Sequence, residues 1–455
     1  MTQENRLIEG AIGPALLRFA LPFLGASFLQ ALYGATDLFV VGQFSGSEAV
    51  SAVAIGSQIM QTITGIILGL ATGGTVLIGR RIGERNDAGA ARAVGSLAVL
   101  LILLAIVLTP IMVLSTNTIV SLMQTPMEAV APARHYLLIC ACGIPFIIGY
   151  NAISGIFRGI GDSKTPMYFV LVACLINVGL DFLLAGYFDY GAAGVAVATV
   201  AAQACSFLAF LFYMNRKGLP FAFSRRDIRL DKPAAAAILK VGFPLALQDA
   251  LVNISFLAIT MIVNTLGLVA SAAVGVVERI IGFALLPPSA FSSAVAAMSA
   301  QNIGAGKPER AWKTLWYAIG FSLVIGTAVC VYVQFFPSVL PRIFDKNPEV
   351  VLAASQYLRA YILDCILVSF VFCFNGYFSG LGKSVIAFGH SMAATFGVRI
   401  PVTYFMSRVV TDSLFPMGLA APAASLLSIL ICIVVLVYFA RREKHASGGT
   451  LEKNA

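Results

Sequence analysis

The sequence predicts an all-α polytopic membrane protein, with twelve transmembrane helices in two six-helix lobes related by a pseudo-two-fold axis along the membrane normal. Of the 455 residues, 59% are hydrophobic and only 11% are charged, whereas soluble domains are roughly 45–50% apolar and about 25% charged. Long apolar runs recur along almost the whole chain, and the second half repeats motifs of the first. These observations exclude an ordinary soluble enzyme.

The apolar runs favour helices over a membrane β-barrel. Barrel strands are about ten residues of alternating polarity, whereas these runs are uninterrupted Leu, Ile, Val, Ala and Phe, and each can cross about 30 Å of hydrocarbon as a helix. The first run shows no cleavage site and is expected to be a span. The predicted spans are residues 14–42, 52–78, 93–114, 133–157, 166–187, 191–214, 236–265, 269–297, 313–335, 353–378, 387–408 and 417–440.

Basic residues gather in alternate loops. Of the 30 Lys and Arg residues, 23 fall on one side of the predicted membrane, five fall on the other, and Arg279 and Arg399 lie inside spans. Because cytoplasmic loops carry the excess of positive charge, we expect an inner (plasma) membrane protein with both termini in the cytoplasm. The net charge of +9 is therefore a topology signal, and no nucleic-acid partner is expected.

A repeat at an offset near 221 residues divides the chain into lobes. The string Gly155-x-Phe157-x-Gly159-x-Gly161-x-Ser163 recurs as Gly376-x-Phe378-x-Gly380-x-Gly382-x-Ser384. Repeats of this kind place binding sites at the interface between them. The predicted organisation is an N-terminal lobe (1–214), a basic cytoplasmic linker (215–235), a C-terminal lobe (236–440) and a cytoplasmic tail (441–455).

Four polar residues in the first lobe form the main candidate site. Ionisable groups inside spans are costly in lipid and indicate function by default. Asn177 and Asp181 share one helix face at i and i+4, and Asp37 and Thr199 are expected at the same depth, in the outer half of the lobe. Their oxygens suit a sodium ion, or a proton shared by the two carboxyls. The alternative is that Asp37 and Asp181 are solvated charges at span ends.

Further candidates surround this site. Pro22 removes a backbone hydrogen bond from span 1 and predicts a hinge, although a packing kink without gating fits equally. The predicted substrate cavity contains Gln30 and Tyr33 on the same face as Asp37, together with Tyr150, Asn151, Asp249 and Glu278. For the aromatic residues ordinary helix packing is the alternative. For Asp249, Glu278, Asp364 and Arg399 of the second lobe, the alternative is ion pairing between spans.

The motifs resemble those of the multidrug and toxin extrusion (MATE) transporters. The similar strings cover both lobes and nearly the full chain, and their order and spacing carry the resemblance. They are Pro22 with Asp37-x-x-x-x-Gly42, Gly155-x-Phe157-Arg158-Gly159-x-Gly161-Asp162-x-Lys164-x-Pro166, Asn177-x-x-Leu180-Asp181, Gly191-x-x-Gly194-x-Ala196-x-Ala198-Thr199 and Arg399-Ile400-Pro401.

The resemblance implies an antiporter, driven by protons or sodium ions, that exports amphipathic cationic drugs or toxic metabolites by alternating access. It implies that the coupling cation, either H⁺ or Na⁺, binds at Asp37, Asn177, Asp181 and Thr199. The branch coupled through a second-lobe aspartate has that residue where Val368 stands here. The chain is therefore more similar to the first-lobe-coupled, DNA-damage-inducible F-like branch. We expect a monomer with a small organic substrate and no cofactor.

Three other classes fit the sequence less well. A flippase for lipid-linked saccharides shares the fold group and remains the alternative, but it would need several cationic residues in its cavity. A major-facilitator transporter would carry an Asp-Arg-x-Gly-Arg loop that residues 79–85 lack. Gly380-Leu381-Gly382-Lys383-Ser384 resembles a phosphate-binding loop, but Tyr377 stands where that motif needs glycine. No enzyme activity is expected.

Overall fold

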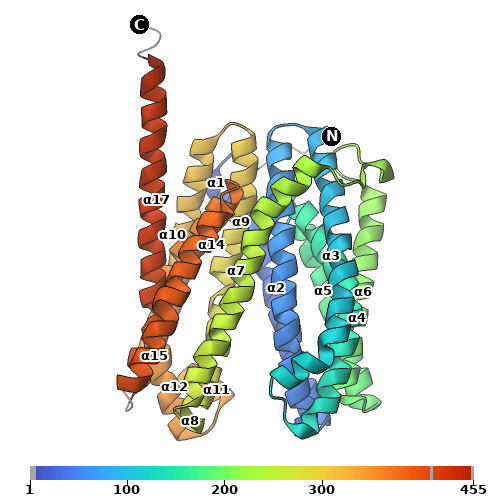
Figure 1. Ribbon diagram of the computed structural model, residues 1–455, viewed down its shortest axis with the longest axis vertical. Helices are drawn as coiled ribbons and strands as arrows, with labels where there is room; N and C mark the ends of the chain where they lie inside the picture. Colours follow the sequence, from blue (N-terminus) through green and yellow to red (C-terminus); the bar gives the residue numbers. More distant parts are fainter. Residues whose placement is uncertain (1–6, 410–412, 452–455) are drawn as a thin grey trace. The chain divides into compact units, whose positions relative to one another are not determined.

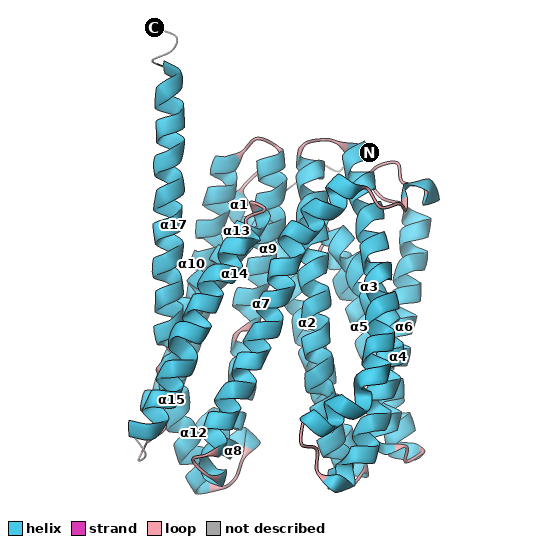
Figure 2. Cartoon of the chain, in the orientation of Figure 1, coloured by secondary structure: helices cyan, strands magenta, loops and turns pink. Residues whose placement is uncertain are grey.

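A computed structural model describes residues 7–409 and 413–451 of the chain. Arg6 and Lys453, which contribute to the predicted charge asymmetry, lie outside the described residues. The described chain consists of helices joined by short loops, without a strand, as Figure 2 shows. The predicted all-α class is confirmed.

The six predicted spans of the first lobe are all present, and most extend beyond their predicted ends. Asn86 caps α3 by accepting a hydrogen bond from the Gly89 amide at 2.8 Å, while α4 ends at Gly161 in the left-handed conformation (φ 100°). The bounds are α1 (Ile12–Phe44), α2 (Ser47–Gly83), α3 (Asp87–Leu122), α4 (Met127–Ile160), α5 (Lys164–Asp181) with the π-helical turn η1 (Phe182–Tyr187), and α6 (Gly191–Lys217).

The predicted linker contains a single 3-10 turn, η2 (Arg225–Asp227). The residue before the turn, Ser224, is its N-cap and forms a capping box with Asp227. The Asp227 carboxylate accepts hydrogen bonds from the Ser224 amide at 2.8 Å and from the Ser224 hydroxyl at 2.9 Å. These bonds favour the ionised form and lower the pKa of Asp227. The linker therefore has a defined backbone at this point.

The second half contains more interruptions than its sequence predicts. Helices α12 and α13 are long and apolar enough for one span only when taken together, and they are bent by 48° at the break between them. Helix α17 continues beyond the predicted span end at residue 440. The bounds are α7 (Lys232–Asn264), α8 (Leu268–Ala284), α9 (Leu286–Gly304), α10 (Pro308–Phe335), α11 (Val339–Phe344), α12 (Pro348–Tyr361), α13 (Asp364–Gly380), α14 (Ser384–Ala394), η3 (Thr395–Arg399), α15 (Ile400–Val409), α16 (Phe415–Gly418) and α17 (Ala420–Leu451).

The chain forms two compact units. The first contains the described part of Met1–Ala250 with Ser289–Ala318 and Gly376–Ser384, and the second contains Leu251–Pro288, Ile319–Asn375 and the described part of Val385–Ala455. In the first unit, α4 packs between α2, α3 and α6, which run side by side in Figure 1. The first unit therefore includes the whole predicted N-terminal lobe.

The repeat predicted from the sequence is visible in the backbone. The turns after α2 and α9 place Arg85 (φ 54°) and Gly306 (φ 68°) in the left-handed region, and the turns after α4 and α13 do the same with Gly161 (φ 100°) and Gly382 (φ 74°). Each pair is separated by the predicted offset. We call the end of the helices that carries these four turns the inner end.

At the inner end, α2 and α9 approach each other through a reciprocal pair of glycines. A Cβ on Gly83 would lie 2.0 Å from the Gln301 carbonyl oxygen, and a Cβ on Gly304 would lie 2.1 Å from the Arg80 carbonyl oxygen. Only glycine permits this approach of two backbones. The two repeats therefore meet at the inner end of the first unit in a symmetric contact.

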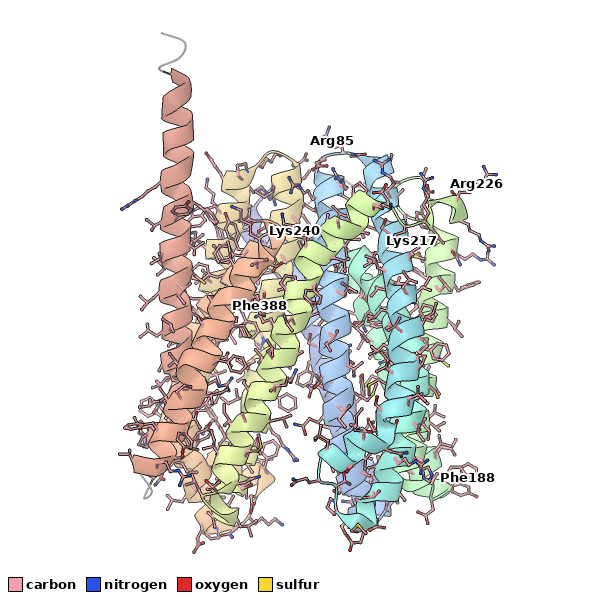
Figure 3. All side chains as sticks on the ribbon, in the orientation of Figure 1. Arg85, Phe188, Lys217, Arg226, Lys240 and Phe388 are labelled. Atoms are coloured by element: carbon pink, nitrogen blue, oxygen red, sulfur yellow. The ribbon has the colours of Figure 1, made fainter. Side chains whose placement is uncertain are left out.

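Basic side chains mark the same end of the first unit. Figure 3 shows Arg85, Lys217 and Arg226 toward one end of the helices and Phe188 at the opposite end. This distribution agrees with the predicted gathering of positive charge on one side. Arg158, counted among those loop residues, is instead buried in the last turn of α4, with 7% of its surface exposed.

Candidate functional site

The structure brings the four predicted first-lobe residues together. Asp37 lies on α1, Asn177 and Asp181 lie on α5, and Thr199 lies on α6. Asp37, Asn177 and Asp181 are almost completely buried, with exposed fractions of 3%, 1% and 0%. Carboxylates at this depth are costly unless protonated or bound to a cation. The alternative of solvated end charges is therefore wrong for both aspartates.

A chain of polar contacts joins the three helices. The Asn177 amide Nδ2 donates to Thr199 Oγ1, and Thr199 Oγ1 donates to Asp37 Oδ2, each at 3.4 Å. The carboxyl groups of Asp37 and Asp181 also lie within hydrogen-bonding reach of each other. Both 3.4 Å distances exceed the usual 2.7–3.2 Å, so the chain of hydrogen bonds holds the Asp37 carboxyl only loosely.

The site contains more acceptors than donors. Four of its buried oxygens receive no hydrogen bond from the described residues: Asp37 Oδ1, Asn177 Oδ1 and both carboxyl oxygens of Asp181. No described Lys or Arg forms an ion pair with either aspartate. Buried acceptors need a partner, and a hard cation or a proton satisfies oxygen ligands of this kind. The oxygen ligands of this site therefore fit Na⁺ or H⁺.

The local sequence explains why α5 presents these groups. Asn177 and Asp181 are separated by one α-helical turn and face the same neighbours. Directly after Asp181, the helix widens into the π-helical turn Phe182–Tyr187. Such turns interrupt α-helices at functional sites and shift the register of the residues that follow. Asp181 is thus the last residue of α5 with regular α-helical geometry.

Gln203 extends the network and was missed by the sequence analysis. It lies one turn after Thr199 on α6, and its amide Nε2 donates to the Tyr33 hydroxyl at 3.3 Å. Tyr33 in turn lies one turn before Asp37 on α1. The i, i+4 spacing from Thr199 was the available signal. Gln30, predicted on the same face of α1, is exposed.

The predicted hinge residue lies inside a continuous helix. Pro22 falls within α1, which extends on both sides of it. The guanidinium of Arg158 lies 5.3 Å from the ring centroid of the next residue, Phe23. The same guanidinium donates a hydrogen bond to the Ser154 carbonyl at 3.2 Å. A buried cation therefore holds α1 against α4 beside the proline.

The other predicted cavity residues are found in several environments. The Tyr150 hydroxyl donates to the Pro166 carbonyl at 3.1 Å, and its ring packs 6.0 Å from that of Phe210. The Asn151 amide donates within its own helix to the Ile147 carbonyl at 2.8 Å. Tyr150 thus shows the packing role that was the alternative for the aromatic residues.

The two second-half acids of the predicted cavity belong to different compact units. Asp249 lies beside Gly65 of α2 in the first unit, where a Cβ on that glycine would be 3.4 Å from the Asp249 Cβ. Glu278 belongs to the second unit. The predicted cavity residues are therefore divided between the two units.

The second unit contains its own polar cluster. The Arg399 guanidinium lies 4.3 Å from the ring centroid of Phe256 and donates to the Tyr361 hydroxyl at 2.5 Å. Asp364 and Glu278 lie within electrostatic reach of this cation. These two acids therefore have a described cation within electrostatic reach, although neither forms an ion pair with Arg399, whereas the described site in the first unit has no such cation nearby.

The MatE family model matches two segments of the chain, residues 22–183 and 244–405. The chain belongs to the MatE family. One matched segment lies in each of the two repeats of this chain.

Curated relatives agree with this assignment. The probable multidrug resistance protein YoeA of Bacillus subtilis is 28% identical over 441 residues, which cover 94% of this chain and 95% of the relative. YpnP of the same organism, also a probable multidrug resistance protein, is 30% identical over 402 residues, covering 88% and 89%. A FAD transporter of Shewanella oneidensis is 25% identical over 475 residues, covering 99% and 100%.

A solved structure shows the same fold. A MATE in complex with MaL6 superposes with a TM-score of 0.90 at 22% identity, covering 98% of this chain and 100% of that one. The twelve-helix, two-lobe architecture predicted from the sequence is confirmed. This MATE protein is a multi-pass membrane transporter and not an enzyme.

Proposed function

We propose that this MATE transporter is a cation-coupled antiporter that exports amphipathic, cationic organic molecules by alternating access. Its setting would be the inner (plasma) membrane, with both termini in the cytoplasm and the basic inner end facing that compartment. A proton or a sodium ion would enter at Asp37, Asn177, Asp181 and Thr199 from the outside. The observation that carries this proposal is the set of four buried acceptor oxygens without donors.

The coupling follows from the charge of the site. Two buried carboxyls in contact cannot both remain ionised without a partner, so the site binds a cation or holds a proton. A cationic substrate near the site would compete for the same negative charge. External cation at the site would then favour outward release of the substrate, because each ligand lowers the affinity for the other.

Transport of ethidium into inside-out vesicles tests the proposal. A proton gradient and a sodium gradient are imposed separately on wild type, Asp37→Asn and the matched control Asp87→Asn, whose side chain is exposed at the start of α3. We expect one gradient to drive uptake in wild type and the control, and uptake to be lost in Asp37→Asn. Equal uptake in all three proteins would remove Asp37 from the mechanism.

The cargo is tested with the same vesicles. Failure of both gradients to move ethidium would contradict the cationic cargo. FAD would then be assayed, because one relative is a FAD transporter, followed by lipid-linked saccharides for the flippase alternative. If wild type transports FAD or a saccharide and Asp37→Asn does not, the proposed coupling site is supported and the proposed cationic substrate is wrong.

A further inference from the structure

Three side chains at the inner end bind the backbone just before α1. The Asn302 amide donates to the Leu7 carbonyl at 3.1 Å, and the Lys307 ammonium donates to the Ile8 carbonyl at 3.0 Å. Leu7 and Ile8 are themselves buried, with exposed fractions of 6% and 5%. We call residues 7–10 the N-terminal strap.

Arg310 makes the largest set of contacts with the strap. Its guanidinium donates to the carbonyl oxygens of Gly10 at 2.7 Å, Glu9 at 2.9 Å and Leu7 at 3.4 Å. Hydrogen bonds from a charged donor are stronger than those between neutral groups, and the planar guanidinium presents five N–H donors in a fixed fork. Arg310 therefore recognises a backbone conformation rather than a side chain.

The strap contacts both repeats. Its carbonyls are held by residues around the α9–α10 turn of the second repeat, whereas the Leu7 side chain lies against the α4–α5 turn of the first, where a Cβ on Gly161 would be 2.9 Å from Leu7 Cδ1. These two turns are also joined directly, because the Gln301 amide donates to the Gly159 carbonyl at 2.8 Å. Separation of the turns requires the strap to leave one of them.

The linker makes the reciprocal connection. It precedes the second repeat but packs on α3 of the first, where the Asp231 amide donates to Ser96 Oγ at 3.0 Å. A Cβ on Gly95 would lie 1.8 Å from the Asp227 carbonyl oxygen, and Phe221 is buried in the first-lobe core. Each segment that leads into a repeat is thus bound by the other repeat.

We infer that Asn302, Lys307 and Arg310 form a peptide-backbone binding site that holds the N-terminal strap and keeps the inner end closed, and that release of the strap precedes opening toward the inner side. The inference rests on the alternating access of the proposed function. The strap acts together with the other contacts at this end, which are the backbone contact at Gly83 and Gly304, the hydrogen bond from Gln301 to Gly159 and the packing of the linker on α3. Arg310 is accordingly a positioning residue of the transport cycle.

Hydrogen–deuterium exchange of the full-length protein in lipid nanodiscs tests the inference. In Arg310→Ala we expect the amides of residues 7–11 and of the inner turns of α2 and α9 to exchange about tenfold faster, because strap and closure open together. Lys313→Ala, one turn along α10 and exposed, is the matched control and is expected to exchange like wild type.

Two outcomes would overturn the inference. One is equal exchange in Arg310→Ala and Lys313→Ala; the other is faster exchange of residues 7–11 alone, which would make the strap a tether without a gating role. If Arg310→Ala does not fold, Arg310→Lys is judged by the same criteria, because lysine keeps the charge but loses the fork. The exchange measurement does not depend on ethidium transport. A wild type that moves no ethidium would therefore contradict the proposed function without deciding whether the strap holds the inner end closed.

Discussion

Thr199 and Asp37, 162 positions apart in the sequence, meet at 3.4 Å between Oγ1 and Oδ2. The contact links α6 to α1 and leaves the second oxygen of Asp37 without a donor. Asp37 therefore keeps one buried carboxyl oxygen for a cation or a proton.

Asp181→Asn should abolish gradient-driven export while the fold is retained. The substitution preserves the shape of the side chain but removes one of two buried charges, so cation binding is lost without a cavity. We expect ethidium uptake into inside-out vesicles to fall to the gradient-free background, with an unfolding temperature no lower than that of wild type. Wild-type transport by this variant would remove Asp181 from the coupling site.

Substrate and coupling ion should weaken each other's binding by the same factor. Coupling free energies are typically 1–3 kcal/mol, which corresponds to about 5- to 150-fold in affinity. Ethidium affinity measured by fluorescence anisotropy should therefore fall as the coupling ion rises, either with decreasing pH or with increasing sodium concentration. An affinity independent of both ions would contradict competition, and Asp37→Asn is expected to show that independence.

Gly83→Ala should destabilise the closed inner end. Its new methyl group would meet the Gln301 carbonyl, and overpacking of this kind costs about 1–3 kcal/mol. Gly320→Ala is the matched control, because nothing lies within 4 Å of its Cβ position and alanine favours a helix over glycine by about 0.5–1 kcal/mol. Thermal unfolding in detergent should show a lower midpoint for Gly83→Ala only.

Pro22→Ala should slow transport if α1 bends during the cycle. Alanine restores the backbone donor that proline lacks and stiffens the helix. Pro110→Ala is the control, since Pro110 also lies inside a long helix, α3, and is exposed. Initial rates of ethidium uptake compare the three proteins. Equal rates would support the packing kink, which the sequence analysis left open.

The helical periodicity and the direction of the spans were sufficient to predict that four polar residues of the first lobe come together. Asn177 and Asp181 were placed on one face by their spacing, and the alternating direction of the spans brought Asp37 and Thr199 to the same depth. Arg158 was assigned to a loop because hydropathy does not distinguish a buried span end from an exposed one, and its partner Phe23 is distant in sequence.

The N-terminal strap could not be predicted from the sequence. Arg310 recognises carbonyl oxygens of residues 7–10, and a backbone ligand leaves no pattern of side chains to detect. The reciprocal glycines Gly83 and Gly304 stand at equivalent positions of the sequence repeat, each after an isoleucine. Their role depends on which helices cross at that point, and local sequence does not specify a crossing between distant segments.

Asp364→Asn should leave the ion dependence of transport unchanged. Asp364 is buried, with 6% of its surface exposed, but lies within electrostatic reach of Arg399, whereas Asp37 and Asp181 have no described cationic partner. A buried acid balanced by a resident cation does not need a transported one. The measurement is ethidium uptake under separate proton and sodium gradients. Loss of coupling in Asp364→Asn would assign a cation site to the second unit and contradict a mechanism confined to the first.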